Sequence, residues 1–221
     1  MKGFEILEKV DHTLLKAGAT WEEIQQLCRE AINCKTASVC IPASYVAPVS
    51  KAYGNQLKIC TVIGFPLGYD TTETKIKAAQ QAIKDGAQEV DMVINITDAK
   101  NGYFDKITSE IASIKEAIGT NILKVIVEAC YLDETEKIRL CQCVTDGHAD
   151  FIKTSTGFGT GGATHEDIIL FSKHIGPNVK IKAAGGIRTI EDMKQYVSEG
   201  CSRIGASAAV GLLKDHKNDD F

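Results

Sequence analysis

Short apolar runs alternate with longer amphipathic stretches along the whole chain, and no linker or low-complexity segment interrupts the alternation. The runs are rich in β-branched residues and have the length of buried strands. They cover residues 9–13, 36–41, 57–63, 89–95, 123–129, 150–155, 179–185 and 202–207. Strands that alternate with helical segments in this way predict a parallel sheet with crossover helices.

Helical periodicity appears between most of these runs, and the residues at its boundaries fit helix ends. Thr20, Thr71 and Asp133 precede acidic first turns and can cap the helices that follow them. Gly86 and Gly200 lie just before strands, where they can end the preceding helix. The predicted helices cover 21–33, 44–53, 73–85, 103–118, 133–145, 164–174 and 190–199.

Eight strand runs within 221 residues favour a closed barrel over an open doubly wound sheet, which more often has about five or six strands. We therefore predict an α/β fold, a single (β/α)8 TIM barrel in which residues 1–221 form one domain. The polar segment KDHKNDDF at 214–221 is expected to form a short mobile tail.

Composition narrows the classes of function. Hydrophobic residues make up 44% of the chain and charged residues 24%, as in an ordinary soluble domain. The net charge is −4 and no dense run of Lys or Arg occurs, which argues against nucleic-acid binding. The apolar runs are too short to cross a membrane, and the N-terminal segment does not resemble a secretory signal. We expect a cytoplasmic protein whose eight cysteines are free thiols.

The alternation of side chains within the strands places charged residues inside the barrel. In each strand the purely apolar set must face the helices, so the other set points inward. Lys153, Lys182, Asp91 and Glu128 belong to these inward sets, towards the strand ends that carry the active sites of such barrels. Buried charges are costly unless they are paired. The pattern therefore indicates an active site, a structural cluster of ion pairs, or solvated strand ends.

Two glycine-containing strand ends predict a phosphate site. Gly185 and Gly186 follow the seventh predicted strand immediately ahead of a helix, and Gly205 and Ser207 end the eighth. Glycine lets a backbone approach an anion closely, and loops after strands seven and eight often bind phosphate in these barrels. The run 154–159, after the strand that contains Lys153, adds hydroxyl groups and flexible backbone. A pair of glycines alone would be read more simply as a turn.

Five segments of the chain resemble the deoxyribose-phosphate aldolases in order and spacing. They are DFIKTSTGFGTGGAT at 150–164, IKAAGGIRT at 181–189, EVDMVIN at 89–95, DHTLL at 11–15 and RIGAS at 203–207. The resemblance implies reversible cleavage of 2-deoxy-D-ribose 5-phosphate into D-glyceraldehyde 3-phosphate and acetaldehyde, in deoxyribonucleoside and carbohydrate catabolism. It also implies a small-molecule sugar phosphate and aldehydes as binding partners, and no cofactor or metal.

The same resemblance assigns roles to residues. It implies that Lys153 forms a Schiff base, that Lys182 and Asp91 donate and accept protons, and that Cys40 lies beside the substrate pocket. Residues implied to contact the substrate or its phosphate are Asp11, Thr156, Gly157, Gly185, Gly186, Gly205 and Ser207. The chain departs from the family at three positions. Phe158 stands where some members have lysine, Thr97 where many have glycine, and Phe221 where some end in tyrosine.

The chemistry explains why two inward lysines are useful. A protonated imine accepts the electrons that are released when a carbon–carbon bond breaks. The attacking lysine must be neutral, and both burial and a neighbouring cation favour the neutral form of a lysine. A carboxylate and a second lysine can then carry protons to and from the substrate.

Other functions remain open at this point. The chain could be another Schiff-base sugar-phosphate aldolase, or a transaldolase-like enzyme, which substrate screening with acetaldehyde as donor would separate. It could also be a non-catalytic barrel that binds sugar phosphates, in which case borohydride would trap no covalent adduct. We expect a homo-oligomer, either a dimer or a tetramer.

Overall fold

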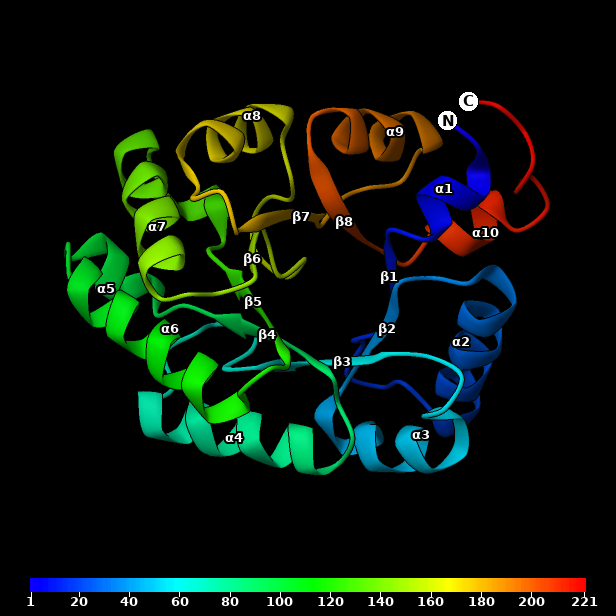
Figure 1. Ribbon diagram of the computed structural model, residues 1–221, viewed down its shortest axis with the longest axis horizontal. Coiled ribbons are helices and arrows are strands. Elements are labelled where there is room, and N and C mark those ends of the chain that lie inside the picture. Colours follow the sequence, from blue (N-terminus) through cyan, green and yellow to red (C-terminus); the bar gives the residue numbers. More distant parts are fainter.

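The computed structural model describes residues 1–221, and its eight strands form one closed parallel barrel (Figure 1). Each strand pairs with the next along the chain, and β8 pairs with β1 to close the barrel. The fold class predicted from the sequence is confirmed. The strands are β1 Val10–Thr13, β2 Ser38–Ile41, β3 Ile59–Ile63, β4 Glu89–Val93, β5 Ile122–Ile126, β6 Phe151–Lys153, β7 Lys180–Ala184 and β8 Cys201–Ala206.

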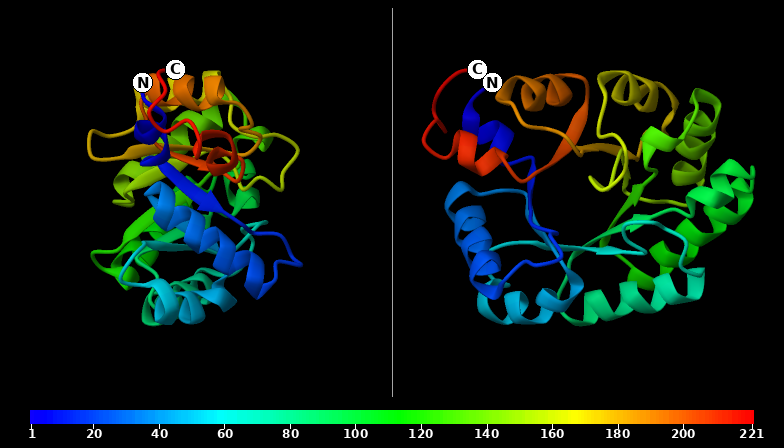
Figure 2. Two further views of the ribbon diagram at one scale, coloured as in Figure 1. Left: turned by 90° about the vertical axis from the view of Figure 1, so that its right-hand side faces the viewer. Right: turned by 180° about the vertical axis from the view of Figure 1, so that it is seen from behind.

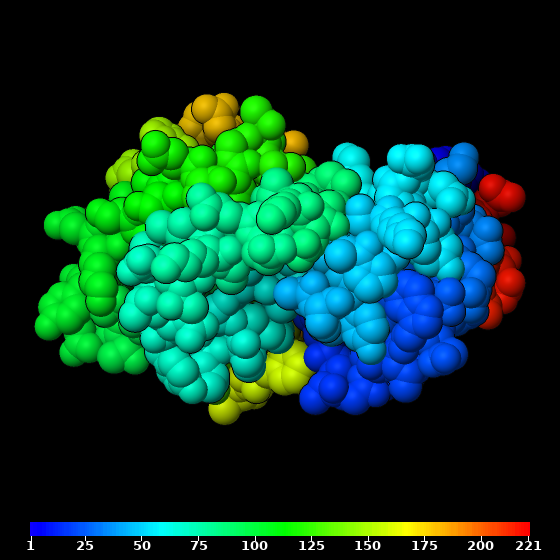
Figure 3. All heavy atoms as spheres, turned by 90° about the horizontal axis from the view of Figure 1, so that it is seen from below, coloured from blue at the N-terminus to red at the C-terminus, as the bar shows by residue number.

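The seven predicted helices are present, and together they surround the barrel (Figures 1 and 2). Seen from below, α2, α3 and α4 form its outer surface on that side (Figure 3). These seven helices are α2 Trp21–Cys34, α3 Val46–Tyr53, α4 Thr72–Lys84, α6 Phe104–Ile118, α7 Glu134–Asp146, α8 His165–His174 and α9 Ile190–Ser198. None of the helices is long and apolar enough to cross a membrane.

Three further helices were not predicted: α1 Gly3–Leu7, α5 Ile96–Lys100 and α10 Ala209–Leu213. Each has only five residues, which is too short to show a helical period in the sequence. Single 3-10 turns also occur at Ala43–Tyr45 and Ala129–Tyr131.

The helix boundaries confirm the predicted caps. The Thr20 side chain accepts a hydrogen bond from the backbone N–H of Glu23 at the start of α2. Asp133 does the same for the N–H of Glu136 at the start of α7. Such bonds satisfy N–H groups that have no partner within the helix. Gly200 has a φ of 110°, a left-handed conformation that favours glycine between α9 and β8.

The apolar core lies between the barrel wall and the helices. Val90, Val125, Ile152 and Ile181 face outward from their strands and belong to one continuous cluster of buried apolar side chains. Their neighbours along the strands point into the barrel, as the alternation predicted. The barrel interior is therefore polar where an ordinary barrel of this kind is filled with branched apolar residues.

The two ends of the chain lie side by side, next to α1 and α10 (Figures 1 and 2). The N–H of Phe4 donates to the carbonyl of Lys217, and the N–H of Phe221 donates to the carbonyl of Met1. The segment 214–221, for which we predicted mobility, thus has hydrogen-bond partners in the N-terminal segment. Phe221 packs against the apolar core.

A buried ion pair fixes α4 and α6 to the barrel, and the sequence analysis did not anticipate it. The Lys75 ammonium group on α4 donates to the carboxylate of Glu110 on α6 and to the carbonyl of Val93 at the end of β4, both at 2.9 Å. The hydroxyl of Thr72 donates to the second Glu110 oxygen at 3.0 Å. Lys75 is fully buried, so its charge depends on these partners.

We expect Glu110→Leu to lower the free energy of unfolding by about 3–5 kcal/mol, because it leaves the buried Lys75 charge uncompensated. The double variant Lys75→Met with Glu110→Leu should recover much of that loss. Glu116→Leu on the same helix is the control, because Glu116 is exposed and such changes usually stay within about 0.5 kcal/mol. Urea unfolding measures all three. A Glu110→Leu variant as stable as Glu116→Leu would contradict this role of the ion pair.

Candidate active site

A pocket of about 510 Å³ lies at the carboxyl ends of the strands. Its walls are loops that follow β1, β6, β7 and β8, and active sites of this barrel architecture occupy this end. In Figure 3 the yellow loop after β6 lies beside the dark blue N-terminal part of the chain. Of the predicted site residues, those that line the pocket are Lys153, Thr156, Gly157, Gly185, Gly186, Gly205 and Ser207.

Asp91 is the centre of a buried ionic cluster beneath this pocket. Its Oδ2 atom accepts hydrogen bonds from the ammonium groups of Lys153 at 2.8 Å and Lys182 at 2.7 Å. Its Oδ1 atom accepts from Lys124 at 2.8 Å and from the Cys60 thiol at 3.1 Å. The register explains this convergence, because Asp91 pairs with Lys124 on β5, and Lys153 on β6 pairs with Lys182 on β7.

Asp11 supports Lys182 and does not reach the pocket. Its Oδ2 atom accepts from Lys182 at 2.5 Å, while its Oδ1 atom accepts from Arg203 at 2.5 Å and from the Ser38 hydroxyl at 2.7 Å. The side chain is fully buried and is not among the residues that line the pocket. The resemblance grouped Asp11 with the substrate-binding residues and placed it near the lysine pair; in the structure it contacts Lys182 and does not line the pocket.

Three members of the cluster received no role from the sequence: Lys124, Glu89 and Arg203. Glu89 binds Lys124 at 2.6 Å and the Arg203 guanidinium at 2.9 Å, and Arg203 continues the chain of contacts to Asp11. Lys124 alternates in phase with Glu128, and Glu89 with Asp91, so strand alternation could have placed both residues on inward faces. Which residues they pair with depends on the register of the barrel strands, which cannot be predicted from the sequence pattern.

The cluster has four basic side chains and three carboxylates, so its basic groups outnumber its acidic groups by one. Lys153 is the basic side chain that lines the pocket. The neutral form of an amine is the form that attacks a carbonyl carbon. The full set comprises Lys124, Lys153, Lys182 and Arg203 with Asp11, Glu89 and Asp91.

The pKa shifts of Asp91 and Lys182 fix the charges of these two side chains. Burial alone would raise the pKa of Asp91, but Lys124, Lys153 and Lys182 outweigh burial and hold that pKa well below its ordinary value. Burial would lower the pKa of Lys182, but Asp11 and Asp91 outweigh it and raise that pKa above its ordinary value. At neutral pH, Asp91 is therefore a carboxylate and Lys182 an ammonium ion.

Hydrogen bonds hold the loop after β6 against the segment after β5 and the end of β7. The Glu128 carboxylate, which the sequence placed among the inward charges, accepts from both the backbone N–H and the hydroxyl of Thr156. Thr154 donates to the carbonyl of Ala184 at the end of β7. Glu128 therefore positions the loop that contains Thr156 and Gly157, and it has no hydrogen bond or ion pair with the lysines.

The rim of the pocket is suited to an anion. Lys16 and Arg188 line it, neither forms an ion pair, and no Asp or Glu side chain lines it. Gly185 and Gly186 have φ values of 85° and 76°, which glycine adopts without strain. The buried Ser155 hydroxyl has no hydrogen-bond partner and lies beside Gly185, so it is free to bind a ligand or water.

Phe158 gives the pocket an apolar wall at the position where the sequence departs from the aldolase motif. Its ring contacts Phe65 edge to face, with ring centroids 5.4 Å apart. The cations that line the pocket rim come from other loops, through Lys16 after β1 and Arg188 after β7.

Comparisons with known proteins agree with this site. Residues 6–218 match the family model described as DeoC/LacD family aldolase. The chain is 59% identical, over the full length of both chains, to a deoxyribose-phosphate aldolase of Clostridium botulinum (strain Alaska E43 / Type E3). It is 56% identical to a deoxyribose-phosphate aldolase of Clostridioides difficile (strain 630), over 98% of this chain and 99% of the relative.

A solved structure extends the similarity to three dimensions. The tetrameric deoxyribose phosphate aldolase from Aeropyrum pernix superposes with a TM-score of 0.88 at 30% identity, covering 96% of this chain and 91% of that one. Sequence family, barrel topology and the pocket over a lysine-containing cluster lead to one conclusion. The chain belongs to the DeoC/LacD family of aldolases.

Proposed function

We propose that this aldolase reversibly cleaves 2-deoxy-D-ribose 5-phosphate into D-glyceraldehyde 3-phosphate and acetaldehyde, with Lys153 forming the Schiff base. One observation carries this assignment. Lys153 is the only member of the buried ionic cluster that also lines the pocket, so a carbonyl compound in the pocket meets its amine and not that of Lys182.

The reaction begins when the neutral Lys153 amine attacks the aldehyde carbon, C1, of the open-chain sugar. The carbinolamine loses water and becomes a protonated imine. A base then removes the proton of the C3 hydroxyl, the C2–C3 bond breaks, and its electron pair moves to the imine nitrogen. D-glyceraldehyde 3-phosphate leaves, and an enamine of acetaldehyde stays on Lys153. Protonation at C2 and hydrolysis release acetaldehyde and restore the amine.

Asp91 and Lys182 serve the proton transfers and stabilise the charges that appear. The Asp91 oxygen that binds Lys153 at 2.8 Å also binds Lys182 at 2.7 Å, so one carboxylate oxygen joins the reacting nitrogen to a proton donor. The carboxylate stabilises the positive imine, and Lys182 supplies or receives protons through water in the pocket. Asp11 is a positioning residue that keeps Lys182 protonated.

The phosphate binds at the pocket wall that the ends of β7 and β8 form. Gly185, Gly186, Gly205 and Ser207 line that wall, and glycine-containing strand ends bind phosphate through backbone donors in other proteins. Lys16 and Arg188 supply positive charge at the rim. Thr156 and Gly157 border the same space from the loop after β6.

We place this reaction in the cytoplasm, in the catabolism of deoxyribonucleosides and carbohydrates. The imine is the electron sink, so the proposed mechanism uses neither a metal nor a cofactor. The tetrameric relative from Aeropyrum pernix supports assembly into a homo-oligomer, which we propose to be a dimer or a tetramer.

Trapping with borohydride tests the proposal. Acetaldehyde followed by borohydride should attach one two-carbon unit to Lys153, located by peptide mass spectrometry. Lys153→Met should abolish the label, whereas Lys180→Met should not, because the exposed Lys180 lies at the far end of β7. A label on Lys182 with Lys153 free would reverse the roles of the two lysines. No covalent adduct at all would favour a barrel that only binds sugar phosphates.

Selectivity for phosphorylated substrate tests the anion site. Ser207 is an exposed residue of the pocket wall, and Ser207→Asp brings a negative charge towards the phosphate. We expect the KM for 2-deoxyribose 5-phosphate to rise about tenfold or more, equivalent to about 1.4 kcal/mol of repulsion, with little effect on unphosphorylated 2-deoxyribose. Ser202→Asp is the matched control at the opposite end of β8. Equal losses on both sugars would assign Ser207 to folding and not to phosphate binding.

The alkaline side of the pH profile tests whether the Lys182 ammonium takes part in turnover. Burial lowers the pKa of Lys182, and among the groups that raise it Asp11 has the largest effect. Asp11→Asn should therefore lower that pKa, so that kcat falls several-fold at alkaline pH values where the unsubstituted protein retains it. Asp215→Asn, at an exposed position, is the control. Circular dichroism should establish that Asp11→Asn is folded across the range. An unchanged alkaline profile in a folded variant would show that turnover does not need the Lys182 proton.

A further inference from the structure

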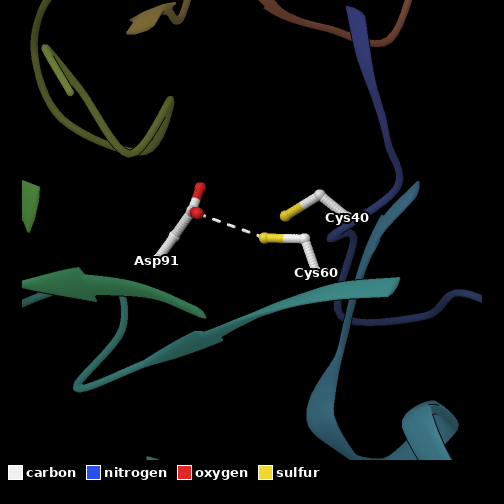
Figure 4. A group of neighbouring side chains, drawn as sticks. All are labelled: Cys40, Cys60 and Asp91. Carbon is white, nitrogen blue, oxygen red and sulfur yellow. Dashed lines mark hydrogen bonds between the residues drawn. The ribbon is translucent and has the colours of Figure 1, made fainter. Parts of the chain in front are cut away.

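Cys40 and Cys60 lie side by side inside the barrel, next to Asp91 (Figure 4). They are direct partners in the register of β2 and β3, and both thiols point towards Asp91 (Figure 4). The two sulfur atoms and an Asp91 oxygen all lie within 4.8 Å of one another. Both cysteines are fully buried, and the proposed mechanism gives a task to neither thiol.

The charges around this pair favour thiol chemistry over metal binding. Two cysteines and a carboxylate are a plausible ligand set for a soft metal ion, and the sequence spacing had not indicated one. However, both Asp91 oxygens already bind lysines, and the Lys124 ammonium lies 3.3 Å from the Cys60 sulfur. A dication at this place would face the Lys124 and Lys182 ammonium groups, which both contact Asp91. The same positive charges stabilise a thiolate.

The surroundings shift the pKa values of the two thiols in opposite directions, which favours Cys40 as the attacking thiolate. The neighbouring Cys60 lowers the pKa of Cys40 and, together with Lys182 and Lys153, outweighs the opposing effect of burial. Burial raises the pKa of Cys60, and Cys40 and Asp91 raise it further. Cys40 is also paired in register with Thr13, so it lies one strand away from a residue that lines the pocket, and we expect peroxide to reach it from that side.

We propose that hydrogen peroxide converts Cys40 and Cys60 into a disulfide, and that this bond reversibly lowers the aldolase activity by removing the thiol contact of Asp91. The geometry permits the bond. Adjacent strands lie about 4.7–4.9 Å apart, which falls within the usual Cα–Cα range of disulfides, about 4.4–6.8 Å. The sulfur atoms can then meet through rotation about the Cα–Cβ bonds and a small approach of the two strands.

The oxidation proceeds in two balanced steps. The Cys40 thiolate attacks one peroxide oxygen, the O–O bond breaks, and the released hydroxide takes a proton to become water, leaving a sulfenic acid on Cys40. The Cys60 sulfur then attacks the Cys40 sulfur, the S–O bond breaks, and hydroxide leaves with the Cys60 proton as water. Two thiols and one hydrogen peroxide thus give one disulfide and two water molecules. A dithiol such as dithiothreitol reverses the result by thiol–disulfide exchange.

The disulfide acts on the reaction through Asp91. The reduced Cys60 thiol donates to Asp91 Oδ1, and its sulfur accepts a contact from Lys124. Oxidation removes the S–H donor and draws the sulfur towards Cys40. Asp91 then loses one of the four groups that fix the direction of its Oδ2 atom towards Lys153 and Lys182. We expect kcat to fall several-fold while the KM changes little, since the phosphate site is untouched.

The effect on activity rests on the proposed function, whereas formation of the bond does not, and the test separates the two. The full-length protein is treated with hydrogen peroxide under native conditions, and free thiols are then alkylated. Peptide mapping without reductant should find a Cys40–Cys60 cross-link that dithiothreitol removes. Aldol cleavage of 2-deoxyribose 5-phosphate, assayed on the same samples, should fall on oxidation and recover on reduction.

Three variants serve as controls, each judged by the ratio of its oxidised to its reduced activity. Cys40→Ala and Cys60→Ala should both lose the cross-link, and their ratios should stay close to one. Cys130→Ala removes the one cysteine that is not buried and should behave like the unsubstituted protein. Absence of the cross-link, or inactivation that disappears only in Cys130→Ala, would overturn the proposal. A cross-link without loss of activity would overturn its regulatory part and leave the aldolase assignment intact.

Discussion

The carboxylate of Asp91, buried among three lysines, sets the geometry of the barrel interior. A buried charge is tolerated only when partners surround it, and removal of one partner leaves the others uncompensated. Each further charge therefore needs its own counter-charge, and the chain of contacts runs from Lys153 through Asp91, Lys124 and Glu89 to Arg203. Loss of one member leaves its partners uncompensated, so the members of the cluster depend on one another. Together they hold the Lys153 amine in one place.

Because the barrel interior is ionic, the hydrophobic stabilisation of the fold comes from the layer between the barrel and the helices. Residues that would fill an ordinary barrel are replaced here by charged ones, so the apolar cluster between strands and helices supplies the hydrophobic stabilisation. The buried Lys75–Glu110 pair ties α4 and α6 to the end of β4 within that layer. These contacts hold the strands in place around the charged interior.

Local patterns in the sequence were enough to predict the strands, the seven longer helices and the inward position of Lys153, Lys182 and Asp91. Contacts set by barrel closure were not predictable. Arg203 meets Asp11 across 192 residues because β8 pairs with β1, and Cys40 meets Cys60 because β2 and β3 are in register. Alternation indicates which face a side chain occupies, but only the register indicates its neighbour. The five-residue helices α1, α5 and α10 are too short to leave a period.

The proposed imine chemistry and the proposed phosphate recognition use different parts of the molecule. The residues proposed for the imine chemistry lie on strands and belong to the ionic cluster, so a substitution there disturbs several partners together. The proposed phosphate contacts come from the end of β8 and from loops, and in loops one residue can replace another without disturbing the barrel. Phe158 illustrates this: a lysine of related chains is absent, yet the rim keeps positive charge through Lys16 and Arg188. Because the loops can exchange cations while the cluster cannot, variation in substrate preference among such barrels should arise at the rim.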